Sequence, residues 1–248
     1  MQSDTQNTTP SSSLIEKLFK AGAHFGFTRA RRHPTVTPFI FGNKQGTDII
    51  DLEKTGELLL KAKSVVSDTA KAGKAVLFVG TKEEVITVVR DAAVKIEMPF
   101  VVNRWIGGML TNWSEIRKRI NRLTDLLAQG ASGELERKYT KKERVIIGRE
   151  IEKLTFNFAG IKDMERIPGL MVIVDPRHDT IALREARDMN IPVIGIVSSD
   201  TNLKEIQYPI VANDTLQSSV RTILEELTDA YTKGKSEYVA PKADVRTR

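Results

Sequence analysis

The sequence predicts an α/β fold in which a five-stranded parallel sheet is flanked by helices and a helical hairpin protrudes from it. Two observations support this prediction. Between residues 74 and 211, short apolar runs alternate with amphipathic stretches, which is typical of βαβ units with strands buried on both faces. Between residues 112 and 158 this alternation stops, and highly charged helical sequence replaces it. We therefore expect one α/β domain interrupted by a helical insertion.

The predicted strands are short, rich in Val, Ile and Phe, and bounded by Gly or Pro. They cover residues 75–79, 100–102, 170–174, 193–197 and 210–211. Continuous apolar runs of this kind indicate strands whose two faces are both covered.

Four amphipathic stretches are predicted to be the helices that cover this sheet. The first spans 53–72, and Gly73 follows it where a helix end favours a left-handed residue. The others span 82–95, 179–189 and 214–231, each with apolar residues on one face.

Residues 112–158 predict two antiparallel helices that pack together as a coiled-coil hairpin. Apolar residues recur with 4-3-4 spacing in two seams, at Ile116, Ile120, Leu123 and Leu127, and again at Ile147, Ile151, Leu154 and Phe158. A Gly-Ala-Ser-Gly break at 130–133 separates the two seams. The alternative is a pair of ordinary core helices, but the many polar positions favour a protruding hairpin.

Five segments follow from these patterns. Residues 1–13 are polar and are predicted to be a disordered tail. Residues 14–111 and 159–232 form the discontinuous α/β domain, residues 112–158 form the hairpin, and residues 233–248 form a basic C-terminal tail.

Composition excludes several classes of protein. The chain has no Cys, so disulfide scaffolds, thiolate zinc sites and cysteine nucleophiles are excluded. The longest apolar runs, 75–79 and 170–174, have five residues, whereas a membrane-spanning helix needs about 20. We expect a cytoplasmic protein with no export signal and no membrane partner.

No motif for catalysis or cofactor binding is found. The first strand is followed by Gly80-Thr81-Lys82, which lacks the glycine spacing of dinucleotide-binding and P-loop motifs. The sequence has no nucleophile elbow, and its three His residues lack the spacing of a zinc pair. We expect no catalytic residue, no metal, no cofactor and no small-molecule substrate. A competing hypothesis is an enzyme that binds a phosphate or nucleotide near Gly80 and Asp175, where Asp179 alternatively caps a helix.

The charge balance favours a polyanionic partner. Lys and Arg number 38 against 32 Asp and Glu, which gives a net charge of +6. Residues 101–155 hold twelve basic side chains against seven acidic ones. Such an arm offers phosphate contacts, although a solvated face or a protein-binding scaffold remains an alternative. Arg29, Arg31 and Arg32 form a second basic cluster, in a predicted loop before Pro34.

Several motifs together resemble one family, that of bacterial small-ribosomal-subunit protein S2 (uS2). The similarity covers roughly residues 14–231. It rests on LFKAGAHFG at 18–26, FIFG at 39–42, IIDLEKT at 49–55, RWIGGMLTN at 104–112, PGL at 168–170, DP at 175–176, EA at 185–186 and IP at 191–192. The chain departs from the family in having Phe27 where a His is common and His33 in place of Trp-Asn.

The resemblance implies a flavodoxin-like domain with a coiled-coil hairpin, docked on small-subunit ribosomal RNA on the solvent side near the head–body junction. It implies neighbouring small-subunit ribosomal proteins as further partners, a place in the cytoplasmic ribosome, and no catalysis.

The residues predicted to bind RNA are arginines and lysines in exposed loops and on the arm. Guanidinium groups can bridge two phosphates, which favours the N-terminal arginine cluster. We expect Trp105 to pack in the core and His24 to be a packed residue that is hydrogen-bonded to the backbone. The predicted RNA-binding set is Arg29, Arg31, Arg32, Arg104, Lys118 and Arg122.

Overall fold

The central sheet of the computed structural model, which describes residues 10–238, has five parallel strands in the order β5-β4-β6-β7-β8. They are β4 (Val76–Val79), β5 (Phe100–Val101), β6 (Leu170–Val174), β7 (Val193–Val197) and β8 (Tyr208–Val211). Numbered along the chain, this spatial order is 2-1-3-4-5, which is the flavodoxin-like order. The predicted fold class is confirmed, and each predicted strand is present within two residues of its expected bounds.

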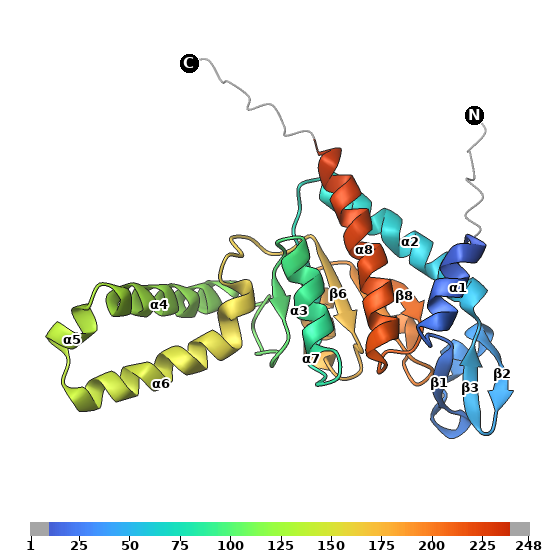
Figure 1. Ribbon diagram of the computed structural model, residues 1–248, viewed down its shortest axis with the longest axis horizontal. Coiled ribbons are helices and arrows are strands. Elements are labelled where there is room, and N and C mark those ends of the chain that lie inside the picture. The colour runs from blue at the N-terminus through green and yellow to red at the C-terminus, as the bar shows by residue number, and fades with distance from the viewer. Residues whose placement is uncertain (1–9, 239–248) are drawn as a thin grey trace, which may run out of the picture.

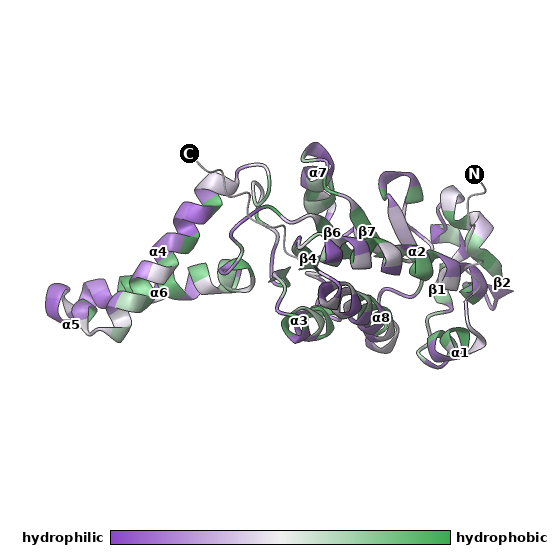
Figure 2. Cartoon of the chain, turned by 90° about the horizontal axis from the view of Figure 1, so that it is seen from above, coloured by the Kyte–Doolittle hydropathy of each residue, from purple (hydrophilic) through white to green (hydrophobic). Residues whose placement is uncertain are grey.

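The sheet is covered on both faces. Helices α2 (Leu52–Lys71), α3 (Ile86–Lys95) and α8 (Gln217–Ser236) cover one face, and α7 (Thr180–Asp188) lies on the other (Figures 1 and 2). Each predicted covering helix is therefore present. Helix α3 begins four residues later than predicted because residues 82–85 form a turn, in which the Val85 amide donates to the Lys82 carbonyl.

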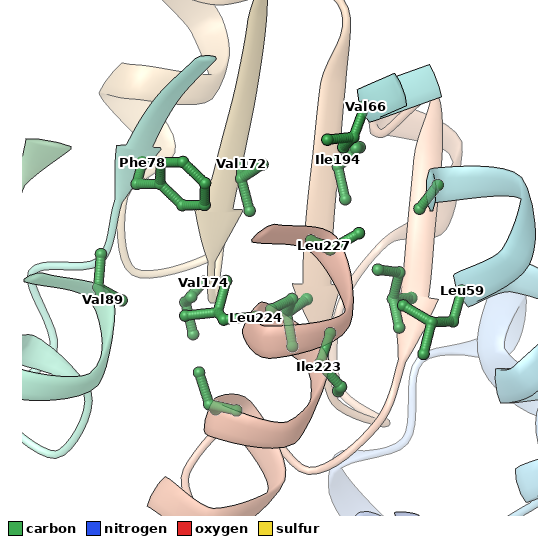
Figure 3. Close-up of a cluster of buried hydrophobic side chains, with 14 of the residues drawn as sticks. Leu59, Val66, Phe78, Val89, Val172, Val174, Ile194, Ile223, Leu224 and Leu227 are labelled. Atoms are coloured by element: carbon green, nitrogen blue, oxygen red, sulfur yellow. The ribbon is translucent and has the colours of Figure 1, made fainter. Parts of the chain in front are cut away.

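Successive side chains of β6 enter two different cores, as expected for a strand with period two. Leu170, Val172 and Val174 pack under α2, α3 and α8, whereas Met171 and Ile173 pack toward α7. Figure 3 shows the first of these cores, where side chains of α8 lie beside those of the sheet. Each fully buried Val or Leu there contributes about 1.5–3 kcal/mol, so this sheet is a rigid base for the loops at its edges.

Helix α2 begins and ends one residue before its predicted bounds, 53 and 72. The Asp51 carboxylate accepts hydrogen bonds from the amides of Glu53 at 3.1 Å and Lys54 at 3.5 Å, which caps the first turn. After the C-cap, Gly73 takes a φ of +66°, the left-handed conformation that glycine adopts most easily.

A three-stranded antiparallel sheet near the N-terminus was not predicted. It consists of β1 (Phe25–Thr28), β2 (Ile40–Lys44) and β3 (Thr47–Ile50), in the order β1-β3-β2. The predicted loop at 29–32 contains a short 3-10 helix, Arg29–Arg31. The sheet is fixed to the main domain at Ser199, whose hydroxyl oxygen accepts from the Phe27 amide and whose carbonyl accepts from the His33 amide, both at 2.8 Å.

The ends of the α/β domain differ from the predicted boundaries by a few residues. Helix α1 (Ser12–Lys20) includes the last two residues of the segment 1–13 that we predict to be a tail. Helix α8 continues to Ser236, beyond the predicted limit at residue 232. Residues 1–9 and 239–248 of the two predicted tails lie outside the described residues.

Two helices, α4 (Trp113–Ala131) and α6 (Lys141–Phe158), form a hairpin that extends away from the central sheet (Figure 1). A short helix that the sequence did not predict, α5 (Glu134–Lys138), joins them. A capping box between Thr140 and Glu143 starts α6. The coiled-coil character of this pair remains a prediction.

One member of the predicted first seam is wrong. Leu127 is 49% exposed, and Leu126 is buried instead, together with Ile116, Ile120 and Leu123. The spacing of the buried positions is therefore 4-3-3, and the buried face turns by about 100° from Leu127 to Leu126 at the far end of α4. In the second seam, Ile151 is partly buried rather than buried, and the other three residues are buried.

Candidate functional site

The carboxyl edge of the parallel sheet is the usual place for a ligand in this topology, but here its charges neutralise one another. The Lys82 ammonium lies 3.0 Å from Asp175 Oδ2 and 3.8 Å from Asp214 Oδ1. Burial, together with the neighbouring charge of Asp175, raises the pKa of Asp214 to about 7, although Lys82 acts in the opposite direction. The lysine of the loop that directly follows β4, Lys82, is thus enclosed by carboxylates, which disfavours a phosphate at this edge.

Asp179 also has an internal role. Its carboxylate accepts hydrogen bonds from the Thr81 hydroxyl at 2.7 Å and the Thr81 amide at 3.2 Å, and it makes no capping bond to α7. Burial raises the pKa of Asp179. Within residues 10–238, no group of three or more His, Asp or Glu could hold a metal ion. The acidic residues of this edge hold loops together.

The three N-terminal arginines divide into two kinds. Arg32 makes a bidentate pair with Asp48, in which Nε donates to Oδ2 at 2.6 Å and Nη2 donates to Oδ1. Asp48 is fully buried, and the hydrogen bonds from Arg32 hold its pKa below the usual value. Arg29 and Arg31 are exposed and make no ion pair with any described residue. The guanidinium of Arg31 lies 5.8 Å from the centre of the Phe27 ring.

Residues 104–112, between β5 and α4, are held by one buried carboxylate. Glu185 of α7 is 6% exposed and accepts hydrogen bonds from the amides of Gly108 at 2.7 Å and Leu110 at 2.9 Å. It also accepts from Trp105 Nε1 and from the amide and hydroxyl of Thr111, each at 3.1 Å. Trp105 is buried, as predicted.

The same contacts leave Arg104 exposed at the surface of this loop. Gly108 has a φ of +92°, a conformation that turns its amide toward Glu185 and that few other residues adopt. Sequence reasoning did not find the role of Glu185, because its partners are about 75 residues away in the chain.

The predicted RNA-binding residues of the hairpin are paired with acidic neighbours. Lys118 lies 2.6 Å from Glu115, and Arg122 Nε lies 3.3 Å from Glu150 Oε1. Both pairs are exposed, and pairs of this kind contribute only about 0–1 kcal/mol, so a phosphate can compete for either cation. Arg117 donates to the Met164 carbonyl at 2.6 Å and fixes the base of α4.

Comparison with known proteins identifies the family. The family model described as "Ribosomal protein S2" matches residues 18–234. This chain belongs to the ribosomal protein S2 family. Members of this family are structural proteins of the ribosome and not enzymes.

Curated relatives of this S2-family chain match it over nearly its whole length. Small ribosomal subunit protein uS2 of Coprothermobacter proteolyticus is 40% identical over 222 residues, which cover 89% of this chain and 82% of the relative. Protein uS2c of Rhodomonas salina is 39% identical and covers 90% and 91%. Protein uS2 of Geotalea uraniireducens is 38% identical and covers 90% and 87%.

In this S2-family chain the six predicted RNA-binding residues lie in three separate segments. Arg29, Arg31 and Arg32 lie directly after β1 of the small antiparallel sheet, and Lys118 and Arg122 are on the hairpin, which extends toward the opposite end of the long axis (Figure 1). Arg104 lies in the loop that leads into the hairpin. Among the helices that the structure describes, none is long and apolar enough to cross a lipid bilayer.

Proposed function

We propose that the chain is a structural constituent of the small ribosomal subunit that binds small-subunit ribosomal RNA through two basic surfaces and supports translation. The observation that carries this proposal is the exposure of Arg29 and Arg31, which have no carboxylate partner among the described residues, in a chain of the S2 family. The proposed position of the chain on the small subunit, near the head–body junction, rests on the family resemblance.

The N-terminal surface consists of Arg29, Arg31 and Lys44, which the small sheet presents together. The Arg29 amide donates to the Gly46 carbonyl at 3.1 Å, and Lys44 pairs with Thr47 across the same turn. Phosphate contacts made by these side chains release counterions, and this release supplies sequence-independent affinity. Arg32 holds Asp48, so we assign it a positioning role under this surface.

The hairpin surface consists of Arg104, Lys118 and Arg122. Arg104 has no ion pair among the described residues. Lys118 and Arg122 must first break their ion pairs with Glu115 and Glu150 before they can bind a phosphate. We therefore expect Arg104 to contribute more to RNA affinity than either residue of the helices.

The outer face of α6 favours contact with a neighbouring small-subunit protein. Exposed Val145, Ile146 and Phe156 lie on one helical face with exposed basic residues between them. Apolar side chains of this kind do not contact phosphate but suit a protein partner. The variant Ile146→Glu is expected to lower recruitment of that neighbour while leaving RNA affinity unchanged.

The experiment that tests RNA binding is the salt dependence of affinity for small-subunit ribosomal RNA. Each lost phosphate contact lowers the magnitude of the slope of log K against log salt by about 0.7–0.9. The double variant Arg29→Ala/Arg31→Ala should therefore lower it by about 1.5. The matched control is Lys61→Ala/Arg90→Ala, which removes two exposed basic residues elsewhere. Equal slopes for the two double variants would contradict the proposal.

A further inference from the structure

An open pocket beside the N-terminal basic surface is lined mainly by aromatic and apolar side chains. It has a volume of about 330 Å³, and its lining includes Phe19, His24, Phe41 and Ile49. This volume is at the small end of the range for ligand sites, about 300–1,000 Å³. The pocket lies at the three-stranded sheet, whose edge strands β1 and β2 each have no further strand beside them within residues 10–238.

The rings around the pocket form a platform. His24 stacks on Phe19 with ring centres 4.6 Å apart and planes inclined by 13°, and Phe25 lies 4.0 Å away on the sheet side. Burial lowers the pKa of His24, which favours the neutral form of its ring. His24 Nδ1 is shielded from solvent and has no hydrogen-bond partner among the described residues, which differs from the backbone-bonded histidine we expected. The platform therefore offers ring faces and few polar groups.

Phe41 is presented by an irregularity of the strand. In β2, Ile40 pairs with Ile50 and Gly42 pairs with Ile49, so Phe41 is the extra residue of a β-bulge. Its side chain is 80% exposed and lines the pocket. A large ring held this far out of the core contributes little to folding, and bulges commonly redirect a side chain toward a binding site.

The charged side chains around the pocket suit different parts of a nucleotide: the carboxylates in the pocket suit a base, and the basic residues beyond it suit phosphates. Glu53 lines the pocket as an exposed carboxylate without an ion pair among residues 10–238, and Asp51 lines it too. Carboxylates repel phosphate but accept hydrogen bonds from the amino groups of bases. Arg29 and Lys44 lie at the other end of the sheet, two residues along β3 from Ile49, or about 7 Å.

We propose that this pocket receives an unstacked base of single-stranded RNA, while Arg29, Arg31 and Lys44 hold the adjoining phosphates. This inference rests on the proposed RNA-binding function and adds to it the class of RNA that the N-terminal surface recognises. RNA-binding proteins commonly stack splayed bases on Phe and His rings beside basic residues. The neighbouring guanidinium groups favour RNA over an apolar protein segment as the occupant.

The test uses the full-length chain with two RNA probes: a single-stranded hexanucleotide with one 2-aminopurine, and a fully paired duplex. Phe41→Ala should weaken hexanucleotide binding by about 5- to 150-fold, leave duplex binding unchanged and leave the salt slope unchanged. Phe41→Trp should restore binding and the fluorescence change of 2-aminopurine, whereas Phe41→Leu should not. The control is Phe156→Ala on the hairpin, which removes another exposed Phe.

The outcomes separate this inference from the proposed function. Unchanged hexanucleotide affinity in Phe41→Ala, together with a reduced salt slope in Arg29→Ala/Arg31→Ala, would overturn the pocket and leave RNA binding intact. Equal restoration by Phe41→Leu and Phe41→Trp would indicate an apolar docking site for protein and would also overturn the inference. Loss of salt dependence in the unmodified chain would overturn the proposed function itself. Because Phe41 is so exposed, circular dichroism should show that each variant is folded.

Discussion

Replacing Glu185 tests whether one carboxylate organises the loop 104–112. It accepts five hydrogen bonds, three of them from backbone amides that cannot be removed by mutation. Leaving a buried donor unsatisfied costs about 1–3 kcal/mol. Gly108 and Thr111 are accessible enough for water to replace part of the loss. We therefore expect Glu185→Ala to lower the free energy of unfolding by about 3–5 kcal/mol.

The variant Glu185→Gln separates charge from shape. Glutamine keeps one acceptor oxygen, but its amide group turns two donors toward a site that already contains donors. We expect this variant to lose about 2–3 kcal/mol, which is less than the alanine variant loses. The exposed Glu57 of the same charge is the matched control, and Glu57→Ala should change stability by less than about 0.5 kcal/mol.

The pH dependence gives a second readout for Glu185. Burial raises the pKa of Glu185, but the hydrogen bonds from Leu110, Gly108 and Thr111 outweigh it, so the pKa lies below its usual 4.5. A carboxyl with a lowered pKa in the folded state stabilises the protein above its unfolded pKa, and this contribution disappears as the pH falls through the folded value. The stability difference between the unmodified chain and Glu185→Gln should therefore shrink in acid.

Urea unfolding followed by circular dichroism measures these free energies, and limited proteolysis reports on the loop itself. Cleavage within residues 104–112 should be faster in Glu185→Ala than in the unmodified chain. A Glu185→Ala protein whose unfolding free energy lies within about 0.5 kcal/mol of the original would refute the assigned role, because several buried donors cannot lose their acceptor without cost.

Three further predictions concern single side chains. Arg32→Ala should cost about 3–5 kcal/mol in urea unfolding because it leaves Asp48 buried without its partner, and a loss below 1 kcal/mol would contradict the ion pair. Asp214 binds a proton more tightly in the folded chain than in the unfolded chain, so stability should fall as the pH rises from about 4 to about 7. In Asp214→Asn this fall in stability with pH should be smaller, and thermal unfolding at several pH values measures it. Leu126→Ala should lower the free energy of unfolding by about 2–4 kcal/mol and Leu127→Ala by less than about 0.5 kcal/mol, as urea unfolding would show. The reverse order would indicate that Leu127, as first predicted, is the buried residue.

The parallel sheet was predictable because its strands bury both faces. The run 170–174 is continuously apolar, the run 193–197 is interrupted only by Gly195, and the observed strands have the same bounds. No partner needs to be known to find such a strand. The hairpin helices were predictable for a similar reason. One residue of spacing decides between Leu126 and Leu127, and only the tertiary packing of α4 shows which of the two is buried.

The antiparallel sheet was not predictable from pattern. Its strands have four or five residues, and the bulge at Phe41 breaks the alternation of β2. Its turn places Gln45 and Gly46 at positive φ, where Asn-Gly is the usual signal. Because β3 was not predicted, the partner of Arg32 could not be recognised, and three adjacent arginines looked equivalent. The same applies to Glu185, which only the fold brings to the loop it holds.

The most direct test of RNA attachment compares the unmodified chain with Arg29→Ala/Arg31→Ala in sucrose gradients of cell lysate at increasing salt, with mass spectrometry of each fraction. We expect the unmodified chain to travel with small ribosomal subunits and to leave them only in high salt, and we expect the double variant to leave at lower salt. A chain found only in the free protein fractions, or a double variant released at the same salt as the original, would contradict RNA attachment through this basic surface.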